Sequence, residues 1–120
     1  MTTQNGTGFL TLPAAAAITE GKRCKINASG QFDVAGATDP AVGVAYHNVA
    51  SGGLLTVKLW SAPGTVLVVA NAAITAGARL YPTANGNVAG TGTTALQLVA
   101  REAAAAQNDI IEALPCQVGA

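Results

Sequence analysis

The sequence has few of the side chains that usually carry chemistry. Its 120 residues include one histidine, two cysteines and one methionine, and only 10% of them are charged. The formal net charge is zero, which argues against a nucleic-acid partner because phosphate backbones are bound by clustered Lys and Arg. A neutral, charge-poor surface also offers little electrostatic repulsion against association with other proteins.

Aromatic residues and long apolar runs are scarce as well. Only 4% of the chain is aromatic, so the core is expected to consist of small Ala and Val side chains, each of which contributes little buried area. No run approaches the roughly 18 apolar residues of a membrane-spanning helix. The start, MTTQNGTGFLTLP, lacks the basic and apolar regions of a signal peptide, so we expect synthesis in a cytoplasm.

The two cysteines, Cys24 and Cys116, are far apart in the sequence and form no C-x-x-C pair. In a reducing compartment we expect them to pack as small apolar side chains, in preference to a disulfide or a metal site. With a single histidine in the chain, other metal ligands are scarce. We therefore predict no metal site and no cofactor.

What the sequence does contain is a repeat. The segment AAITEGKRCK at 16–25 recurs 56 residues later as AAITAGARLY at 72–81. One residue is then lost, and the Val-Ala pair at 44–45 aligns with the pair at 99–100. The repeat covers 14–59 and 70–114. Two copies are too few for a solenoid, so we expect one closed domain over 13–120 with approximate two-fold symmetry.

Local patterns within each copy favour strands. NASG at 27–30 and TANG at 83–86 each separate two short runs, as hairpin turns do. LLTVKL at 54–59 alternates like a half-buried strand, and the β-branched run TVLVVA at 65–70 is typical of a strand buried on both faces. We predict an all-β fold, a small β-barrel or β-sandwich built from two similar strand-hairpin-strand halves.

One segment, REAAAAQNDIIEAL at 101–114, has the composition of a helix. The repeat aligns its first part with the loop YHNVASGGL at 46–54, which no propensity rule would make helical. We follow the repeat and predict a loop followed by a strand at 110–114.

Residues 1–12 lie outside the repeat and form a predicted extended N-terminal arm. The arm is rich in Thr, Asn and Gly and has one apolar patch at Phe9 and Leu10. Two interpretations stand: an arm that becomes ordered on a partner, or a tail without a role.

His47 is the only side chain suited to general-base catalysis at neutral pH, and it lies in a predicted loop. A general base needs an orienting carboxylate and a nucleophile close by, and no motif arranges Asp39 or a serine in that way. The carboxylates show no pairing that suggests glycoside hydrolysis, and GNVAGTG at 86–92 lacks the Lys-Ser/Thr of a phosphate-binding loop. We predict that the protein has no catalytic residues and is not an enzyme.

Interface candidates come from charge and residue type. The basic cluster of Lys22, Arg23 and Lys25 fits either a docking patch for an acidic surface or a solvated strand face. Tyr and Trp are enriched at the energetic centres of interfaces, although a Trp in so aromatic-poor a chain is more often core. The predicted interface residues are Thr2, Thr3, Gln4, Asn5, Phe9, Leu10, Lys22, Arg23, Lys25, Tyr46, Trp60 and Tyr81.

The order of these motifs resembles phage head decoration proteins of the capsid cement type. The family pattern is an A-I-T-x-G-x-x-V entry, a Gly-centred hairpin, a V-G-V-A strand, an A-x-x-G loop and an alternating strand. Here the first round reads AAITEGKRCKI, NASGQFDV and AVGVAYHNVASGGLLTVKLW. The second round departs from the pattern, with LQLVA for VGVA and an Ala run for the Gly-Gly loop. The resemblance covers 13–114.

This resemblance implies a non-enzymatic virion protein that binds the outside of an expanded phage head and bridges neighbouring coat subunits. The implied partner is the major capsid protein of a tailed phage, bound by a homotrimer at local three-fold positions. The protein would be made in the bacterial host cytoplasm and located on the capsid exterior, without a nucleic-acid or membrane partner. The alternatives are a head-fibre base or tail adaptor, and a small carbohydrate-binding β module, which would need exposed aromatics beside a groove.

Overall fold

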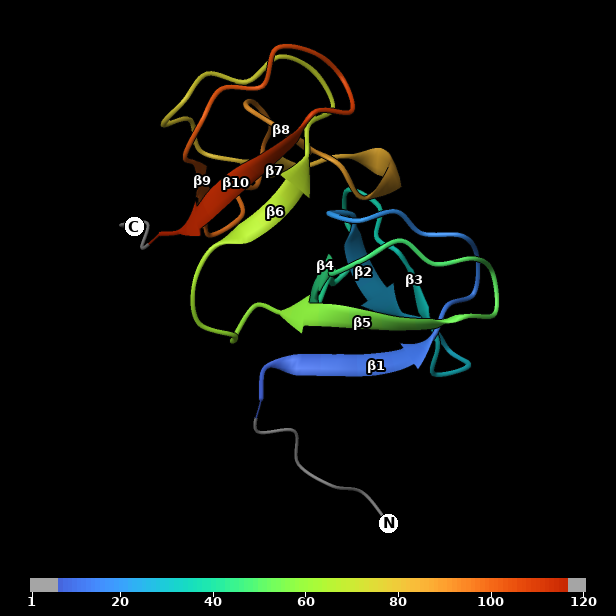
Figure 1. Cartoon of the computed structure of the whole chain (residues 1–120). Helices are drawn as coiled ribbons and strands as arrows, with labels where there is room; N and C mark the ends of the chain where they lie inside the picture. The colour runs from blue at the N-terminus through green and yellow to red at the C-terminus, as the bar shows by residue number, and fades with distance from the viewer. Residues whose placement is uncertain (1–6, 117–120) are drawn as a thin grey trace.

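The protein, described by a computed structural model over residues 7–116, is built from short strands and one short 3-10 helix, η1 (Figure 1). The elements are β1 (Phe9–Pro13), β2 (Arg23–Ile26), β3 (Phe32–Val34), β4 (Gly43–Ala45), β5 (Leu54–Leu59), β6 (Val66–Val69), β7 (Tyr81–Pro82), η1 (Ala84–Gly86), β8 (Val88–Ala89), β9 (Leu98–Ala100) and β10 (Ile110–Pro115). The predicted all-β fold class is confirmed.

The first half of the chain forms one antiparallel sheet in the order β1-β5-β4-β2-β3. A parallel bridge between Ala14, just after β1, and Phe32 in β3 joins the two edges of this sheet. The sheet is thereby closed into a small barrel. Figure 1 shows this half as the blue and green lobe, with the yellow-to-red second half above it.

The second half repeats this arrangement strand for strand. Its sheet β6-β10-β9 is linked to the pair β7-β8 by bridges from Arg79 to Val99 and from Ala70 to Val88. The resulting strand order, β6-β10-β9-β7-β8, corresponds to the order β1-β5-β4-β2-β3 of the first half. Hydrogen-bonded loops recur as well, since Ile18 bridges Val49 in one half and Ile74 bridges Ala104 in the other. Each repeated AAITxG phrase places a buried isoleucine in this bridge.

The buried apolar side chains form two clusters, one centred in each half, and Val44 of the first half belongs to the second cluster. The first core contains Ala14, Ile18, Cys24, Phe32, Ala45, Leu55 and Val57. Their counterparts by strand register, all in the second core, are Ala70, Ile74, Leu80, Val88, Ala100, Ile111 and Ala113. The sequence alignment of 59 with 114 is therefore wrong by one residue in this strand, because Leu55 corresponds to Ile111 and not to Ile110. Phe32 with Cys24 is replaced by Val88 with Leu80, so a large and a small side chain exchange for two of middle size. Such volume compensation preserves packing density.

The described part of the expected arm belongs to the sheet. Residues 9–13 form β1, in which Leu12 pairs with Leu55, and the counterpart of this pair is Val68 with Ile111 in β6 and β10. The repeat therefore includes β1, although β1 and β6 share only apolar residues at two core-facing positions, Leu10 and Leu12 in β1 and Val66 and Val68 in β6. Residues 1–6 lie outside the described residues, and with them the predicted interface residues Thr2, Thr3, Gln4 and Asn5.

The structure shows the conformation of 101–109 and the burial of 65–70, two segments whose sequence patterns were ambiguous. Residues 101–109 form an irregular loop before β10, as the repeat predicted and the helical composition did not. The run at 65–70 is not buried on both faces, because Leu67 in β6 is 42% exposed. One face of β6 covers the second core, and on the other face Leu67 reaches the surface while Val69 is buried against the first half.

Candidate functional site

Arg23 lies in the seam between the two halves and is 1% exposed. Its Nε donates a hydrogen bond to the carbonyl of Asn87 at 3.2 Å, and its Nη2 donates to the carbonyl of Thr83 at 2.7 Å. Longer contacts of 3.4 Å reach the carbonyls of Ala35 and Gly36. Burial lowers the pKa of the guanidinium, while the charge of Asp39 opposes this shift. Arg23 therefore joins the halves and is not a residue of an exposed docking patch.

The other two cations of the cluster also have intramolecular partners. Lys22 donates from Nζ to Oδ1 of Asn87 at 2.5 Å, and Lys25 forms an ion pair of 3.0 Å with Asp39. Asp39 also accepts a hydrogen bond from the Gly36 N–H, which with Lys25 lowers the pKa of its carboxyl group. The sequence could not show this, because the partners of Lys22 and Arg23 come from a turn more than 60 residues away.

An apolar surface lies at the seam, the boundary along which the two halves of the molecule meet. The rings of Phe9 and Tyr46 meet edge to face, with centroids 5.2 Å apart. Tyr46 is 56% exposed, and across the seam Leu67 is 42% exposed. We call Phe9, Tyr46 and Leu67 the seam patch. A hollow of about 320 Å³ beside Tyr46 and Leu67 has Glu20 and Lys58 among its lining residues.

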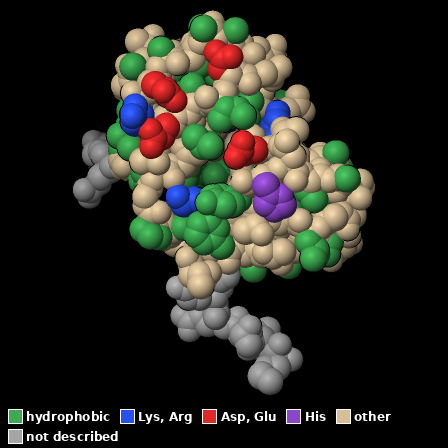
Figure 2. Space-filling view, in the orientation of Figure 1, with side chains coloured by type: hydrophobic (Ala, Val, Ile, Leu, Met, Phe, Trp, Pro, Cys, Tyr) green, Lys and Arg blue, Asp and Glu red, His purple; other side chains and the backbone are tan. Residues whose placement is uncertain are grey.

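Figure 2 shows how this face is composed. Hydrophobic side chains gather near its centre, with Lys or Arg and Asp or Glu side chains around them and the single histidine beside them. An apolar centre within a polar rim is the usual composition of a protein interface. The structure therefore brings together two predicted interface residues, Phe9 and Tyr46, and adds Leu67, which the apolar run at 65–70 had concealed.

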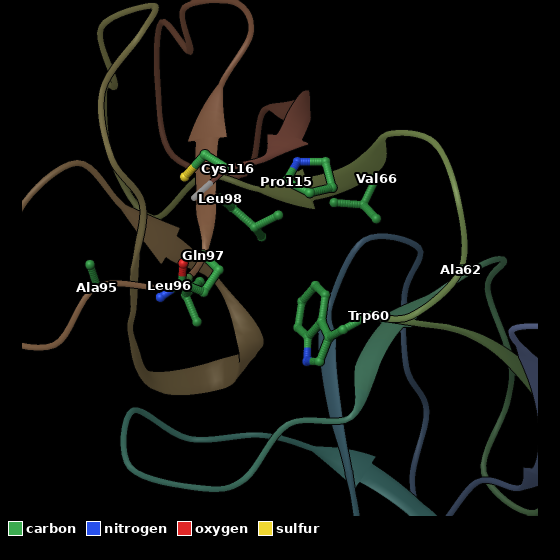
Figure 3. A pocket seen from close by; sticks show the side chains of 9 residues that line it. All are labelled: Trp60, Ala62, Val66, Ala95, Leu96, Gln97, Leu98, Pro115 and Cys116. Atoms are coloured by element: carbon green, nitrogen blue, oxygen red, sulfur yellow. The ribbon is translucent and has the colours of Figure 1, made fainter. Parts of the chain in front are cut away.

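Trp60 forms one wall of a second cleft, of about 410 Å³ (Figure 3). Its indole Nε1–H donates to the carbonyl of Ala41 at 2.8 Å, and its ring packs against the second core. Across the cleft lie Leu96 and Leu98. The half-buried Trp60 thus acts mainly as a packing residue between halves.

The remaining predicted interface residues are also partly buried. Leu10 packs against the first core, and Tyr81 in β7 is half-buried over Gly92. Neither lies in the seam patch as we define it.

His47 holds its loop to the sheet. Its Nε2 accepts a hydrogen bond from the Thr56 N–H at 3.1 Å, so Nδ1 carries the proton and donates to the carbonyl of Asn48 at 2.9 Å. Both ring nitrogens are therefore used by backbone groups. Within residues 7–116, no group of three or more His, Cys, Asp or Glu side chains is placed to hold a metal ion. In the same range, no helix has the length and apolar character needed to cross a bilayer.

The two cysteines are free thiols in different surroundings. Cys24 is fully buried, and burial raises the pKa of its thiol to about 12, whereas Cys116 is half-buried. Because the thiolate is the reactive form, we expect Ellman's reagent at pH 8 to label one thiol per native chain and two after denaturation. The variant Cys116→Ser should show no native labelling. Rapid labelling of Cys24 in that variant would contradict the packing described here.

These features define a small all-β protein with paired barrels and an apolar patch where the barrels meet. The phage cement protein family matches the chain over residues 3–114, and the chain belongs to that family. The resemblance seen in the sequence is thus confirmed. The protein is a structural component of a phage particle.

A solved structure supports the fold independently. The N base of head fiber gp8.5 in bacteriophage phi29 superimposes with a TM-score of 0.72, over 93% of this chain and 98% of that chain, at 16% sequence identity. At so low an identity the likeness concerns the fold. Among curated proteins, none matches the chain.

Proposed function

We propose that this protein decorates the outer surface of an expanded phage head, where it bridges neighbouring coat subunits as a trimer at local three-fold positions. The observation that carries the proposal is membership of the cement family across residues 3–114. A ligand that binds only the assembled shell stabilises that shell by mass action. Modest contacts suffice, because each copy spans several subunits and the contacts are repeated over the whole shell.

We propose the seam patch as the surface that meets the coat protein. Tyr46 and Leu67 are among the described large apolar side chains that remain exposed, and with the ring of Phe9 they form an apolar centre. Clustered aromatic and aliphatic side chains of this kind provide most of the energy in many interfaces. Glu20 and Lys58 in the adjoining hollow supply polar groups of both signs at its edge.

The variant Leu67→Asp tests this assignment, with Leu54→Asp as its control. Both leucines are exposed strand residues, at 42% and 66%, but Leu54 lies outside the seam patch. A charge that must lose its water in the interface should weaken binding to stripped heads about thirtyfold, or roughly 2 kcal/mol, for Leu67→Asp alone. Equal affinities of the two variants in a sedimentation assay would exclude the seam patch as the coat-binding surface.

A second candidate function is favoured by the fold likeness to the phi29 head-fiber base. Such a protein would also bind the phage head, but as the base to which a head fibre is attached. Copy number separates the two functions. A decoration protein saturates a head at on the order of hundreds of copies, because its energetic effect depends on repeated contacts, and a fibre base occupies far fewer positions.

A further inference from the structure

The two halves of the molecule are joined head to tail. The first half presents a receiving face, which we define by Gly21 and Arg23. The second half presents an inserting face, which we define by the turn 83–87 and Val69. A Cβ added to Gly21 would lie 3.0 Å from Cγ2 of Val69. The turn 83–87 accepts hydrogen bonds from Arg23 at two of its carbonyls.

Because the halves are repeats, each also has a copy of the other's face. The counterparts of Gly21 and Arg23 are Gly77 and Arg79, and both are exposed in the second half. The counterpart of the turn 83–87 is the turn 27–31 in the first half, and its Gly30 is exposed. One receiving face and one inserting face are thus left uncovered within a single chain.

The glycines show how different the covered and uncovered faces are. A Cβ added to Gly86 would lie 2.8 Å from Cγ1 of Val34 in the opposite half, whereas one added to Gly30 would meet nothing within 4 Å. Likewise, Gly77 has open space where Gly21 is in contact with β6. The backbone conformations agree, with φ between +74° and +87° at all four glycines. The faces therefore share local backbone shape and differ in whether a partner is present.

We propose that a second copy of this chain fills the vacant receiving face, with its turn 27–31 placed on Arg79 as the turn 83–87 is placed on Arg23. Arg79 would then donate to the carbonyls of Asn27 and Gln31 of the next copy, the counterparts of Thr83 and Asn87. Head-to-tail contacts of this kind close into rings when the rotation allows it. Three copies form the ring if the trimer of the proposed function holds, and the inference rests on that function for this number.

The substitutions between the faces are compatible with this contact. In the second half Ala78 replaces Lys22 and Gly90 replaces Val34, so the receiving face is wider. Gln31, which must enter it, is one methylene longer than its counterpart Asn87. The loss of the Lys22–Asn87 hydrogen bond makes the contact between copies weaker than the contact within a chain.

Two variants of the full chain test the proposal in solution. Arg79→Ala removes the donor of the receiving face, and Gln31→Arg places a second cation opposite Arg79. We expect wild type at high micromolar concentration to sediment with three times the mass of one chain, and each variant to sediment as a monomer. An equimolar mixture of the variants should form a dimer, since each retains one intact face. Gln107→Ala, an exposed position in neither face, should keep the wild-type mass.

A monomeric wild type, variants with the wild-type mass, or a mixture that stays monomeric would each overturn the inference. A thermal melt of each variant shows that it is folded before its mass is interpreted. Decoration of the head fails separately: wild type that binds heads but is monomeric in solution overturns the contact between copies and leaves the decoration of the head in place. Wild type that forms the ring but binds no head overturns only the decoration function.

Discussion

Replacing Arg23 with methionine is expected to lower the free energy of unfolding by about 3 kcal/mol. Arg23 is 1% exposed, and the closest hydrogen bonds of its guanidinium are to the carbonyls of Thr83 and Asn87. Methionine fills a similar volume but donates no hydrogen bond, so these carbonyls would lose their donor in the seam. Urea denaturation followed by circular dichroism measures the loss.

Arg101→Met is the control for this change. Arg101 forms an ion pair with Glu112 at 2.7 Å, but 55% of its side chain is exposed. Exposed ion pairs contribute little, and we expect a loss of less than about 1 kcal/mol. The two variants thus compare the stability lost at a buried arginine bound to carbonyl groups with the stability lost at an exposed arginine bound to a carboxylate. Equal losses for the two variants would show that the seam does not depend on Arg23.

Replacing Gly86 with alanine is expected to cost roughly 2–3 kcal/mol. Gly86 has φ of +74°, and its added Cβ would lie 2.8 Å from Cγ1 of Val34 and 3.1 Å from the carbonyl oxygen of Arg23. The variant therefore combines backbone strain with a collision across the seam.

Gly30→Ala separates these two effects. Its φ of +77° is nearly the same, but its added Cβ would meet nothing within 4 Å. Backbone strain alone should cost about 1 kcal/mol. The difference between the variants, measured by the same urea titration, is the packing cost at the seam. A Gly30→Ala variant as unstable as Gly86→Ala would contradict the close contact of the turn 83–87 with the first half.

The sequence predicted the features that local patterns and the repeat determine. The turns around Gly30 and Gly86, the alternation at 54–59 and the strand at 110–114 all appear in the structure. At 101–109 the alignment with the first copy outweighed helix propensity. Propensity differences are fractions of a kcal/mol per residue, and tertiary contacts such as the Ile74–Ala104 bridge override them.

Contacts between the halves could not be predicted in this way. The sequence shows three neighbouring cations at 22–25, but the carbonyls that bury Arg23 belong to a turn in the other half. Residue type made Tyr46 an interface candidate, whereas Leu67, which lines the same hollow, could not be distinguished within a run of apolar residues. The repeat in the sequence did not include β1, because the segments 9–13 and 65–69 face their cores at matching positions but have no identical residue.

The decoration function is tested most directly by co-sedimentation of the purified protein with expanded phage heads stripped of accessory proteins, with the bound copies counted per head. We predict saturable binding at on the order of hundreds of copies, and heads that then survive a higher temperature than undecorated ones. Saturation at a dozen copies or fewer, or the absence of binding, would contradict the decoration function.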